Sequence, residues 1–294
     1  MNVTIQQLSH VFMPNTPFET KALQEVTLAF PEGSFSAVIG RTGSGKSTLV
    51  QHMNGLLKPS AGKLEIGGQV IHPKTKRKTL NTLRRKVGMV FQYPEHQLFE
   101  ETVEKDILFG PKNIGLSMEK MKKKLPQLLE QVGLDESFLP RSPFDLSGGQ
   151  MRRTAIAGVL AMEPELLILD EPTAGLDPQG QEDMMTLFQE WHHVHGTTVI
   201  LITHQMEEAA RLAEHVIVME EGQVSMEGRP QEIYERESEL KALDLDIPER
   251  VRVLKQIEEE TGCSFSSYSL SPEEAVKEIR QFRTLQRTRR KVDV

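Results

Sequence analysis

A glycine-rich segment between an apolar strand and a helix is the feature that most constrains this chain. It reads Gly40-Arg41-Thr42-Gly43-Ser44-Gly45-Lys46-Ser47, with Thr48 next, and it follows the apolar run 35–39. Glycines let backbone N–H groups turn inward around a phosphate, and a helix N-terminus adds positive potential. The pattern therefore predicts a triphosphate-binding loop in which Lys46 reaches the β and γ phosphates and Ser47 binds Mg²⁺. A tight glycine turn without a ligand is the alternative, which the flanking strand and helix disfavour.

Two carboxylates follow a second apolar strand. Residues 166–169 are a continuous apolar run with helical sequence on both sides, which is typical of a strand buried on both faces of a parallel sheet. Asp170 and Glu171 come directly after it. Ionised groups in such a place are costly unless they meet a cation or an acidic proton. We predict that Asp170 belongs to the Mg²⁺ shell and that Glu171 is the general base that polarises the attacking water.

A second glycine-rich helix start lies between these two motifs. The segment Leu146-Ser147-Gly148-Gly149-Gln150 opens a helical pattern that continues through Leu160. It offers glycines, a serine hydroxyl and the positive end of a helix dipole, which together favour an anion. One triphosphate already has its own loop, so a second phosphate cradle requires a different ligand. A helix N-cap without any ligand is the alternative.

Together the three motifs resemble the ABC ATPase family, whose signature is LSGGQ. The resemblance implies that Ser147, Gly148, Gly149 and Gln150 close over the γ-phosphate of ATP held by an opposite subunit. It also implies roles for three single residues. Gln92 resembles the Q-loop glutamine that touches Mg²⁺ and water and senses the membrane partner, Asp177 resembles the aspartate at the dimer seam, and His204 resembles the switch histidine that contacts the γ-phosphate.

The family also stacks an aromatic side chain on adenine, roughly 28 residues before the lysine of the phosphate loop. Phe18 lies at that distance from Lys46. Phe12 is the alternative, because Asn15-Thr16-Pro17 looks like a small insertion that shifts the alignment.

The order of the elements predicts an α/β protein. Residues 64–71 read as a hairpin that turns at Gly67-Gly68, residues 216–226 read as a closing hairpin, and Pro248–Thr261 reads as a charged amphipathic helix. The resemblance implies a P-loop NTPase (RecA-like) core with an ABC β-subdomain, an inserted helical subdomain and a small C-terminal helical extension. We assign residues 1–94 and 164–228 to the nucleotide-binding core, 95–163 to the helical signature subdomain, and 229–294 to a C-terminal dimerisation extension ending in a disordered basic tail.

The segment after Gln92 narrows the resemblance. Residues 91–99, Phe-Gln-Tyr-Pro-Glu-His-Gln-Leu-Phe, look like the ATPase subunits of energy-coupling factor (ECF) transporters, and Met151-Arg152-Arg153 suits the same group. That group implies three partners: a second, paralogous ATPase, a transmembrane coupling subunit, and a membrane-embedded substrate-binding subunit for vitamins or transition-metal ions. Acidic residues in the right place could meet arginines of the coupling subunit, although acids in the first turn of a helix explain them equally well: Glu100, Glu101 and Asp106. The long segment 73–86 indicates the second ATPase of a heterodimeric pair.

Composition limits the location and the partners. A formal net charge of -7 with 5% aromatic residues argues against nucleic acid as the main partner. No run approaches the ~18 apolar residues of a membrane helix, and the start of the chain lacks a signal-peptide pattern. The single cysteine, Cys263, fits a reducing cytosol. We expect a peripheral protein on the cytoplasmic face of the cell membrane. The basic run 74–86 is either a solvated face or a surface for anionic lipid.

The sequence therefore predicts an ATP-hydrolysing, Mg²⁺-dependent subunit that energises an ECF-type importer of micronutrients as one half of an ATP-sandwich dimer. A soluble ABC ATPase acting on nucleic acid or ribosomes is the alternative, which the single cassette and the compact insert disfavour. A nucleotide switch without turnover is disfavoured because Glu171 and His204 are both present.

Overall fold

The computed structural model describes residues 1–262, 264–265, 274–282 and 284, and it contains two β-sheets. The larger sheet has six strands in the order β10-β9-β3-β8-β7-β6, and all neighbours are parallel except β9 and β10, which form the predicted closing hairpin. Its strands are β3 (Phe35–Ile39), β6 (Val87–Val90), β7 (Leu166–Asp170), β8 (Thr198–Ile202), β9 (His215–Glu220) and β10 (Gln223–Gly228).

The smaller sheet is antiparallel, with four strands in the order β2-β1-β4-β5. Gly67 and Gly68 make the turn between β4 and β5 with φ angles of 52° and 78°, so the hairpin predicted there is confirmed. The four strands are β1 (Val3–Phe12), β2 (Thr20–Phe30), β4 (Ala61–Ile66) and β5 (Gln69–Ile71).

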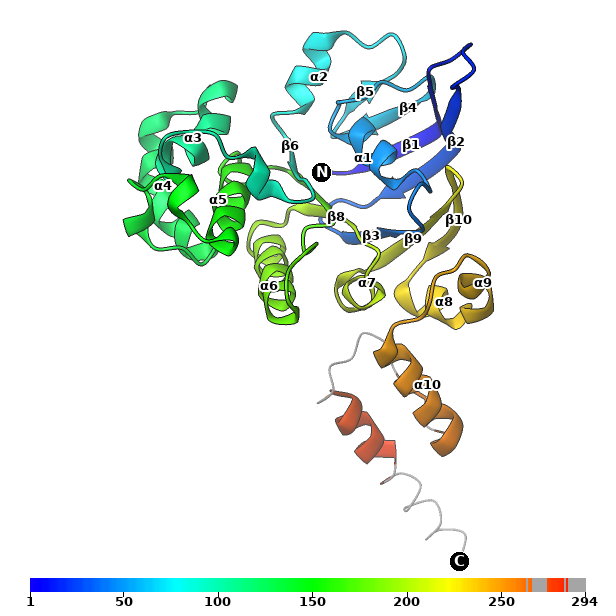
Figure 1. The fold of residues 1–294 in the computed structure, drawn as a ribbon. Coiled ribbons are helices and arrows are strands. Elements are labelled where there is room, and N and C mark those ends of the chain that lie inside the picture. Colours follow the sequence, from blue (N-terminus) through cyan, green and yellow to red (C-terminus); the bar gives the residue numbers. More distant parts are fainter. Residues whose placement is uncertain (263, 266–273, 283, 285–294) are drawn as a thin grey trace, which may run out of the picture.

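The helices fall into groups that cover different parts of the sheets (Figure 1). Three of them, α3, α4 and α5, gather at one end of the molecule, and the last ones lie at the other end below β9 and β10. The labelled helices are α1 (Lys46–Met53), α2 (Arg77–Leu83), α3 (Val103–Ile114), α4 (Met118–Gln131), α5 (Gly148–Leu160), α6 (Pro178–His195), α7 (Met206–Leu212), α8 (Pro230–Glu235), α9 (Glu237–Ala242) and α10 (Glu249–Thr261), with short 3-10 turns η1 (Pro94–Gln97), η2 (Glu136–Phe138) and η3 (Pro143–Asp145). Residues 274–282 are helical as well.

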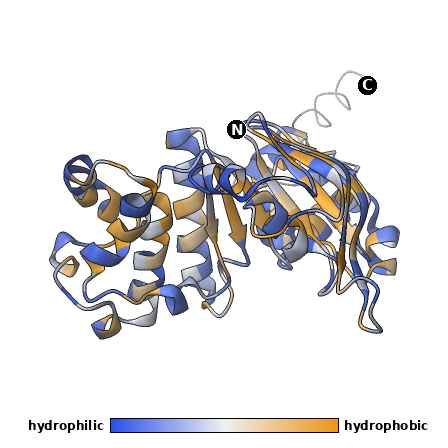
Figure 2. Ribbon diagram, turned by 90° about the horizontal axis from the view of Figure 1, so that it is seen from above, coloured by the Kyte–Doolittle hydropathy of each residue, from blue (hydrophilic) through white to orange (hydrophobic). Residues whose placement is uncertain are grey.

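The central strands are buried on both faces, as the continuous apolar runs predict. In β8, Ile200 and Ile202 pack in the cluster that contains α1 and the antiparallel sheet, whereas Val199 and Leu201 face the cluster that contains α5 and α6. Figure 2 shows the same separation, with hydrophobic residues concentrated on the strands and on the inward sides of the helices. This arrangement fixes the strands firmly, so the loops at their ends are held at defined positions.

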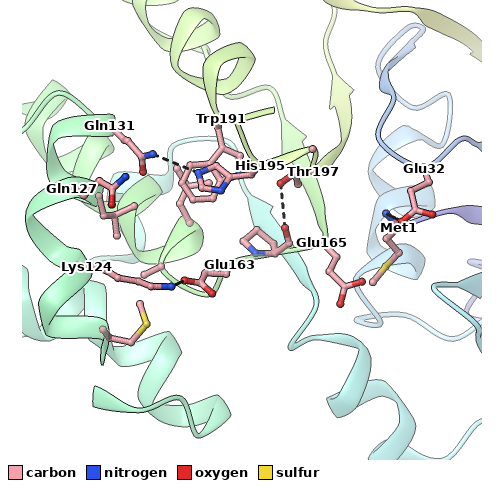
Figure 3. A pocket seen from close by; sticks show the side chains of 16 residues that line it. Met1, Glu32, Lys124, Gln127, Gln131, Glu163, Glu165, Trp191, His195 and Thr197 are labelled. Atoms are coloured by element: carbon pink, nitrogen blue, oxygen red, sulfur yellow. Dashed lines mark hydrogen bonds and ion pairs between the residues drawn. The ribbon is translucent and has the colours of Figure 1, made fainter. Parts of the chain in front are cut away.

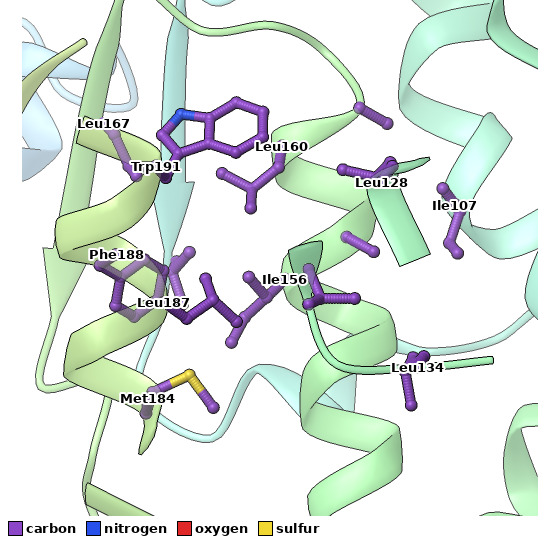
Figure 4. Packing of buried hydrophobic residues seen from close by; sticks show 14 of the residues in the cluster. Ile107, Leu128, Leu134, Ile156, Leu160, Leu167, Met184, Leu187, Phe188 and Trp191 are labelled. Atoms are coloured by element: carbon purple, nitrogen blue, oxygen red, sulfur yellow. The ribbon is translucent and has the colours of Figure 1, made fainter. Parts of the chain in front are cut away.

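The helical segment between residues 95 and 163 is joined to the sheet by continuous apolar packing (Figure 4). Ile156 and Leu160 of α5 lie between Leu128 of α4 on one side and the α6 residues Phe188 and Trp191 on the other. The helix that carries the predicted signature therefore rests directly on the core. The boundaries assigned to this subdomain stay a prediction.

The C-terminal helices pack on the outer face of β9. Tyr234 of α8 is fully buried, and Val251 and Leu254 of α10 share its cluster. The helix predicted from Pro248 is confirmed as α10, with Pro248 as its N-cap. The predicted basic tail, 283–294, lies outside the described residues except for Thr284. Within the described part of the chain, none of the helices combines the length and apolar character that a membrane crossing requires.

Candidate functional site

The glycine-rich loop connects β3 to α1, as the sequence predicts. Gly40, Gly43 and Gly45 have φ angles of 147°, 86° and 102°, a backbone region that other residues rarely adopt. A Cβ at Gly40 would lie 2.3 Å from Met219 O, and one at Gly45 would lie 2.6 Å from Ala22 O. Glycine is therefore required both by the backbone conformation and by the close approach of neighbouring chain.

Lys46 lies inside this loop. Its side chain is buried, and its Nζ donates hydrogen bonds to Gly40 O at 2.7 Å and to Arg41 O at 2.8 Å. Burial lowers the pKa of Lys46, while the negative charges of Glu171 and Asp170 raise it. The phosphate loop and the predicted carboxylate pair therefore share one electrostatic environment. Ser47 lies in the first turn of α1 and is exposed.

The two predicted carboxylates end the buried strand β7. Asp170 is its last residue, and burial, followed by the charge of Glu171, raises the pKa of Asp170 to about 6. Glu171 has a φ of 49°, an uncommon conformation for this residue type. Its backbone N–H donates to Ile202 O of β8 at 2.9 Å. The turn after β7 is thus set in a conformation that costs roughly 1–3 kcal/mol and must be held by its surroundings.

Gln92, Glu171 and His204 converge. Gln92 Nε2 donates to Glu171 Oε2 at 2.9 Å, and His204 Nδ1 lies 3.2 Å from Glu171 Oε1. The three residues follow β6, β7 and β8, which are adjacent parallel strands, and ligands bind at the carboxyl ends of such strands. The side chains of His204 and Glu171 are 62% and 26% exposed, so water can reach the cluster.

The donor set proposed for Mg²⁺ is chemically suitable. Ser47, Gln92 and Asp170 offer a hydroxyl, an amide oxygen and a carboxylate, and Mg²⁺ takes oxygen ligands, usually one or two carboxylates with waters and substrate phosphates. Asp170 is close enough to Lys46 for each charge to shift the pKa of the other. Gln92 joins the same cluster through its hydrogen bond to Glu171.

The signature segment forms the start of α5. Ser147 Oγ accepts from Gln150 N, and Gln150 Oε1 accepts from Ser147 N at 3.0 Å, which is a capping box. Gly148 and Gly149 are exposed, and a Cβ on either would meet no described atom within 4 Å. A capping box is formed by the side chains of its first and fourth residues and does not require glycine at the two positions between them. The N-cap alternative therefore explains Ser147 and Gln150 but not the two glycines.

Asp177 and the adenine-stacking aromatic stay predictions. Asp177 caps α6, with its Oδ1 accepting from Gly180 N at 2.8 Å, and it is exposed. Phe18 is 75% exposed and precedes β2, whereas Phe12 ends β1 and packs edge to face with His10 at 4.4 Å. The segment between the two phenylalanines forms the loop between β1 and β2, as expected for an insertion.

Two later segments that no motif marks also lie beside the phosphate loop. A hollow of about 280 Å³ is lined by residues 41–44, by the turn between β9 and β10, and by Ala242, Leu243 and Leu245. Arg41 also forms an ion pair with Asp244. Asp244 follows a short helix without any motif, so no sequence signal could have placed it beside the loop.

A buried carboxylate was also missed. Glu208 of α7 accepts from Thr173 Oγ1 at 2.6 Å and from Thr203 Oγ1 at 2.7 Å. Thr173 follows the predicted base by two residues, and Thr203 precedes His204. Glu208 therefore ties the loop after Glu171 to the segment that carries His204. Its position one turn after His204, in a helix with an apolar face, is the only signal in the sequence.

A separate cavity of about 530 Å³ lies at the other end of the strands (Figure 3). It is lined by Glu165 and Thr197, which precede β7 and β8, and by Trp191 and His195, whose rings stack at 3.9 Å. Its location at the amino ends of the strands separates it from the predicted nucleotide site at their carboxyl ends.

Comparison with known proteins agrees with the geometry. Residues 23–174 match the ABC transporter family. The energy-coupling factor transporter ATP-binding protein EcfA2 of Bacillus cereus (strain ATCC 10987 / NRS 248) is 52% identical over 281 residues, 96% of each chain. EcfA2 of Enterococcus faecalis (strain ATCC 700802 / V583) is 50% identical over 279 residues, 95% of this chain and 96% of the relative.

Two solved structures share the fold. CbiO1 from Clostridium perfringens, part of the ABC transporter complex cbiONQ, is 37% identical with a TM-score of 0.71, covering 87% of this chain and 98% of that one. The dimeric ATP-binding cassette MJ0796 bound to ADP and Pi is 30% identical with a TM-score of 0.69, covering 78% of this chain and 98% of that one. The predicted fold class is thereby confirmed. The chain belongs to the ABC transporter family and, within it, to the energy-coupling factor transporter ATP-binding proteins.

Proposed function

We propose that this chain hydrolyses ATP as one half of a nucleotide-sandwich dimer and thereby energises an ECF-type importer of micronutrients. The observation that carries the proposal is the convergence of Gln92, Glu171 and His204 at the ends of three adjacent strands, beside the phosphate loop that holds Lys46. A nucleotide switch would not need a general base held between two hydrogen-bonding partners.

Each residue has a definite task in hydrolysis. The loop 40–47 binds the phosphates, and Lys46 offsets their negative charge. Glu171 accepts the proton of the attacking water, while Gln92 and His204 keep its carboxylate oriented. Mg²⁺ bound with ATP would neutralise charge on the phosphate oxygens, and Ser47, Asp170 and Gln92 are the residues that would hold it.

The exposed start of α5 supports the need for a second subunit. Gly148 and Gly149 face open space, so a phosphate from another chain could approach their backbone N–H groups. MJ0796, which shares the fold, was solved as a dimer with ADP and Pi. We propose that the partner is a paralogous ATPase and that Asp177 lies at the seam between the two, with the segment 229–294 adding to their contact.

A surface near the Q-loop supports docking to a transmembrane coupling subunit. Phe99 and Phe109 are 57% and 40% exposed and contact each other edge to face at 4.8 Å. Of the acids beside them, Asp106 accepts from the backbone of Phe99 and Glu100, and Glu101 pairs with Lys105. The apolar pair, with Glu100 next to it, is therefore the better candidate for the docking surface than Asp106.

The relatives support a membrane transporter: one set is named for the energy-coupling factor transporter, and CbiO1 is described as part of the cbiONQ complex. We accordingly place this chain on the cytoplasmic face of the cell membrane, where a membrane-embedded subunit selects the substrate.

Affinity purification of the tagged chain from its own membranes tests the proposal. We expect a second ATPase and membrane proteins to co-purify and the complex to hydrolyse ATP in the presence of Mg²⁺. Recovery of RNA or ribosomal proteins in place of membrane proteins would favour the alternative, a soluble ABC ATPase. A complex that binds ATP but never hydrolyses it would refute the role of Glu171.

A further inference from the structure

Arg152 is a buried arginine that the proposed mechanism does not use. It lies in α5, five residues after Ser147, and only 3% of it is exposed. Its Nε and Nη2 donate to Glu95 Oε2 at 2.8 Å and to Glu95 Oε1 at 2.7 Å. Its Nη1 donates to Ala174 O at 2.9 Å and to Pro172 O at 3.4 Å. One guanidinium therefore holds two segments that are far from it in the sequence.

These contacts have a defined geometry. A bidentate pair between arginine and a carboxylate fixes the relative orientation of both groups, which a lysine cannot do. Burial raises the pKa of Glu95, but the hydrogen bonds and charge of Arg152 outweigh it, so the pKa of Glu95 is held below its usual value. The pair is thus ionised at neutral pH, and the planar guanidinium is restrained on both sides.

The two segments held by Arg152 belong to different parts of the site. Glu95 lies in η1, three residues after Gln92 and shortly before the exposed Phe99. Residues 172–174 directly follow Glu171, and their other side is fixed where Thr173 donates to the buried Glu208. A shift of α5 or of η1 would therefore reach the loop after Glu171, because that loop is already restrained from the opposite side.

We propose that Arg152 is a positioning residue. It couples the segment after Gln92, and the transmembrane coupling subunit that docks there, to the orientation of the Glu171 side chain. The inference rests on the proposed function, because that function assigns Glu171 as the general base. Docking at the surface that includes Phe99 moves η1, Arg152 transfers that movement to the backbone of residues 172–174, and the orientation of the Glu171 carboxylate changes with it. ATP binding at the phosphate loop does not depend on this connection.

Arg152→Lys tests the proposal in the complete transporter complex and in the detached ATPase pair. A lysine ammonium carries its donors on a single nitrogen, so it cannot reproduce the planar fork that bonds both oxygens of Glu95 and the Ala174 carbonyl through three separate nitrogens. We expect KM for ATP to stay within about twofold, and kcat of the complex to fall by about tenfold or more, because a misplacement of 1 Å costs up to about 10²-fold. We also expect the stimulation of hydrolysis by the membrane subunits to be lost.

Arg153→Lys is the matched control. It makes the same substitution at the next position of α5, where Arg153 donates to Val132 O at 2.7 Å and lies 3.9 Å from Asp183. We expect this variant to retain the stimulation. Glu95→Gln weakens the same ion pair by changing the carboxylate instead of the guanidinium. It serves as the test if Arg152→Lys does not fold. The kcat losses of Glu95→Gln and Arg152→Lys should be clearly non-additive when combined.

The outcomes separate a positioning role from a purely structural one. If Arg152→Lys lowers Tm but keeps the parental kcat and stimulation, Arg152 only holds α5 in place and the inference is wrong. A rise in KM with unchanged kcat contradicts it equally. If the parental complex itself does not hydrolyse ATP, the proposed function fails, and that result is distinct from any behaviour of the variants.

Discussion

Replacing Asp170 with asparagine should stabilise the nucleotide-free chain while abolishing Mg²⁺-dependent hydrolysis. Asp170 ends a buried strand, and its pKa is raised from 3.8 to about 6 by burial and by the neighbouring charge of Glu171. The folded state thus disfavours the ionised carboxylate. Asparagine has a similar shape without the charge, so Asp170→Asn removes that unfavourable term.

The magnitude follows from the shift. Two pKa units correspond to about 3 kcal/mol at 1.36 kcal/mol each. Asp170 is only partly buried, and solvent screening reduces the figure, so we expect a gain of about 1–2 kcal/mol. At about 2–4 °C per kcal/mol, Tm should rise by roughly 2–8 °C.

The raised pKa of Asp170 also determines how the stability difference between the variant and the parent changes with pH. Below pH 3.8 the carboxyl is protonated in both the folded and the unfolded chain, and the penalty is absent. It accumulates as the pH rises toward 6 and is complete above that value. The difference in Tm between Asp170→Asn and the parent should therefore be close to zero near about pH 3 and constant above about pH 7.

Thermal unfolding with EDTA and without nucleotide measures this difference. Asp145→Asn, at an exposed carboxylate, is the control and should leave Tm unchanged. Adding Mg²⁺ and ATP should reverse the order, because a ligand stabilises only the state that binds it and the variant lacks one oxygen donor. A variant that is less stable than the parent at pH 8 in EDTA would refute the electrostatic reasoning.

Three further predictions concern turnover. Glu171→Gln keeps one hydrogen-bond acceptor for Gln92 or His204, so ATP should still bind while kcat falls by about 10²–10⁴-fold; near-parental hydrolysis would exclude Glu171 as the base. Lys46→Ala should instead weaken ATP binding, measured by calorimetry, because it removes the buried cation of the phosphate loop. Gly148→Ala meets no described atom within 4 Å, so Tm and ATP binding to the isolated chain should be unchanged while hydrolysis by the assembled pair is lost; full activity would show that no ligand approaches there.

The motifs allowed most of the site to be predicted because their chemistry is local. The loop around Lys46 needs glycines at fixed spacing, and Asp170 and Glu171 stand out as charges after an apolar strand. The parallel strands then bring Gln92, Glu171 and His204 together, since equivalent strand ends meet at one edge of the sheet. The strand and hairpin patterns likewise predicted the sheets.

The residues that hold this site in place could not be predicted in the same way. Arg152 and Glu208 act through partners that are remote in the sequence, and an isolated charge in a helical pattern is usually exposed. The burial of Arg152 becomes visible only in the folded structure, where α5 packs against the sheet. Its hydrogen bonds to Glu95 and Ala174 then show which segments it connects. A local motif thus predicts which groups react, whereas their relative positions depend on buried polar contacts.

The strained turn at Glu171 connects the residues predicted from the motifs with the buried residues that hold them in place. A residue at a φ of 49° persists only where its surroundings restrain it, and here the restraints come from both sides: Arg152 holds the carbonyls of Pro172 and Ala174, and Glu208 holds Thr173. We expect release of either restraint to let the turn relax toward an ordinary conformation and to change the orientation of the Glu171 carboxylate. The orientation of Glu171, the proposed base, therefore depends on the helices α5 and α7 that hold the following loop, and this is the physical basis of the proposed coupling to the docking surface.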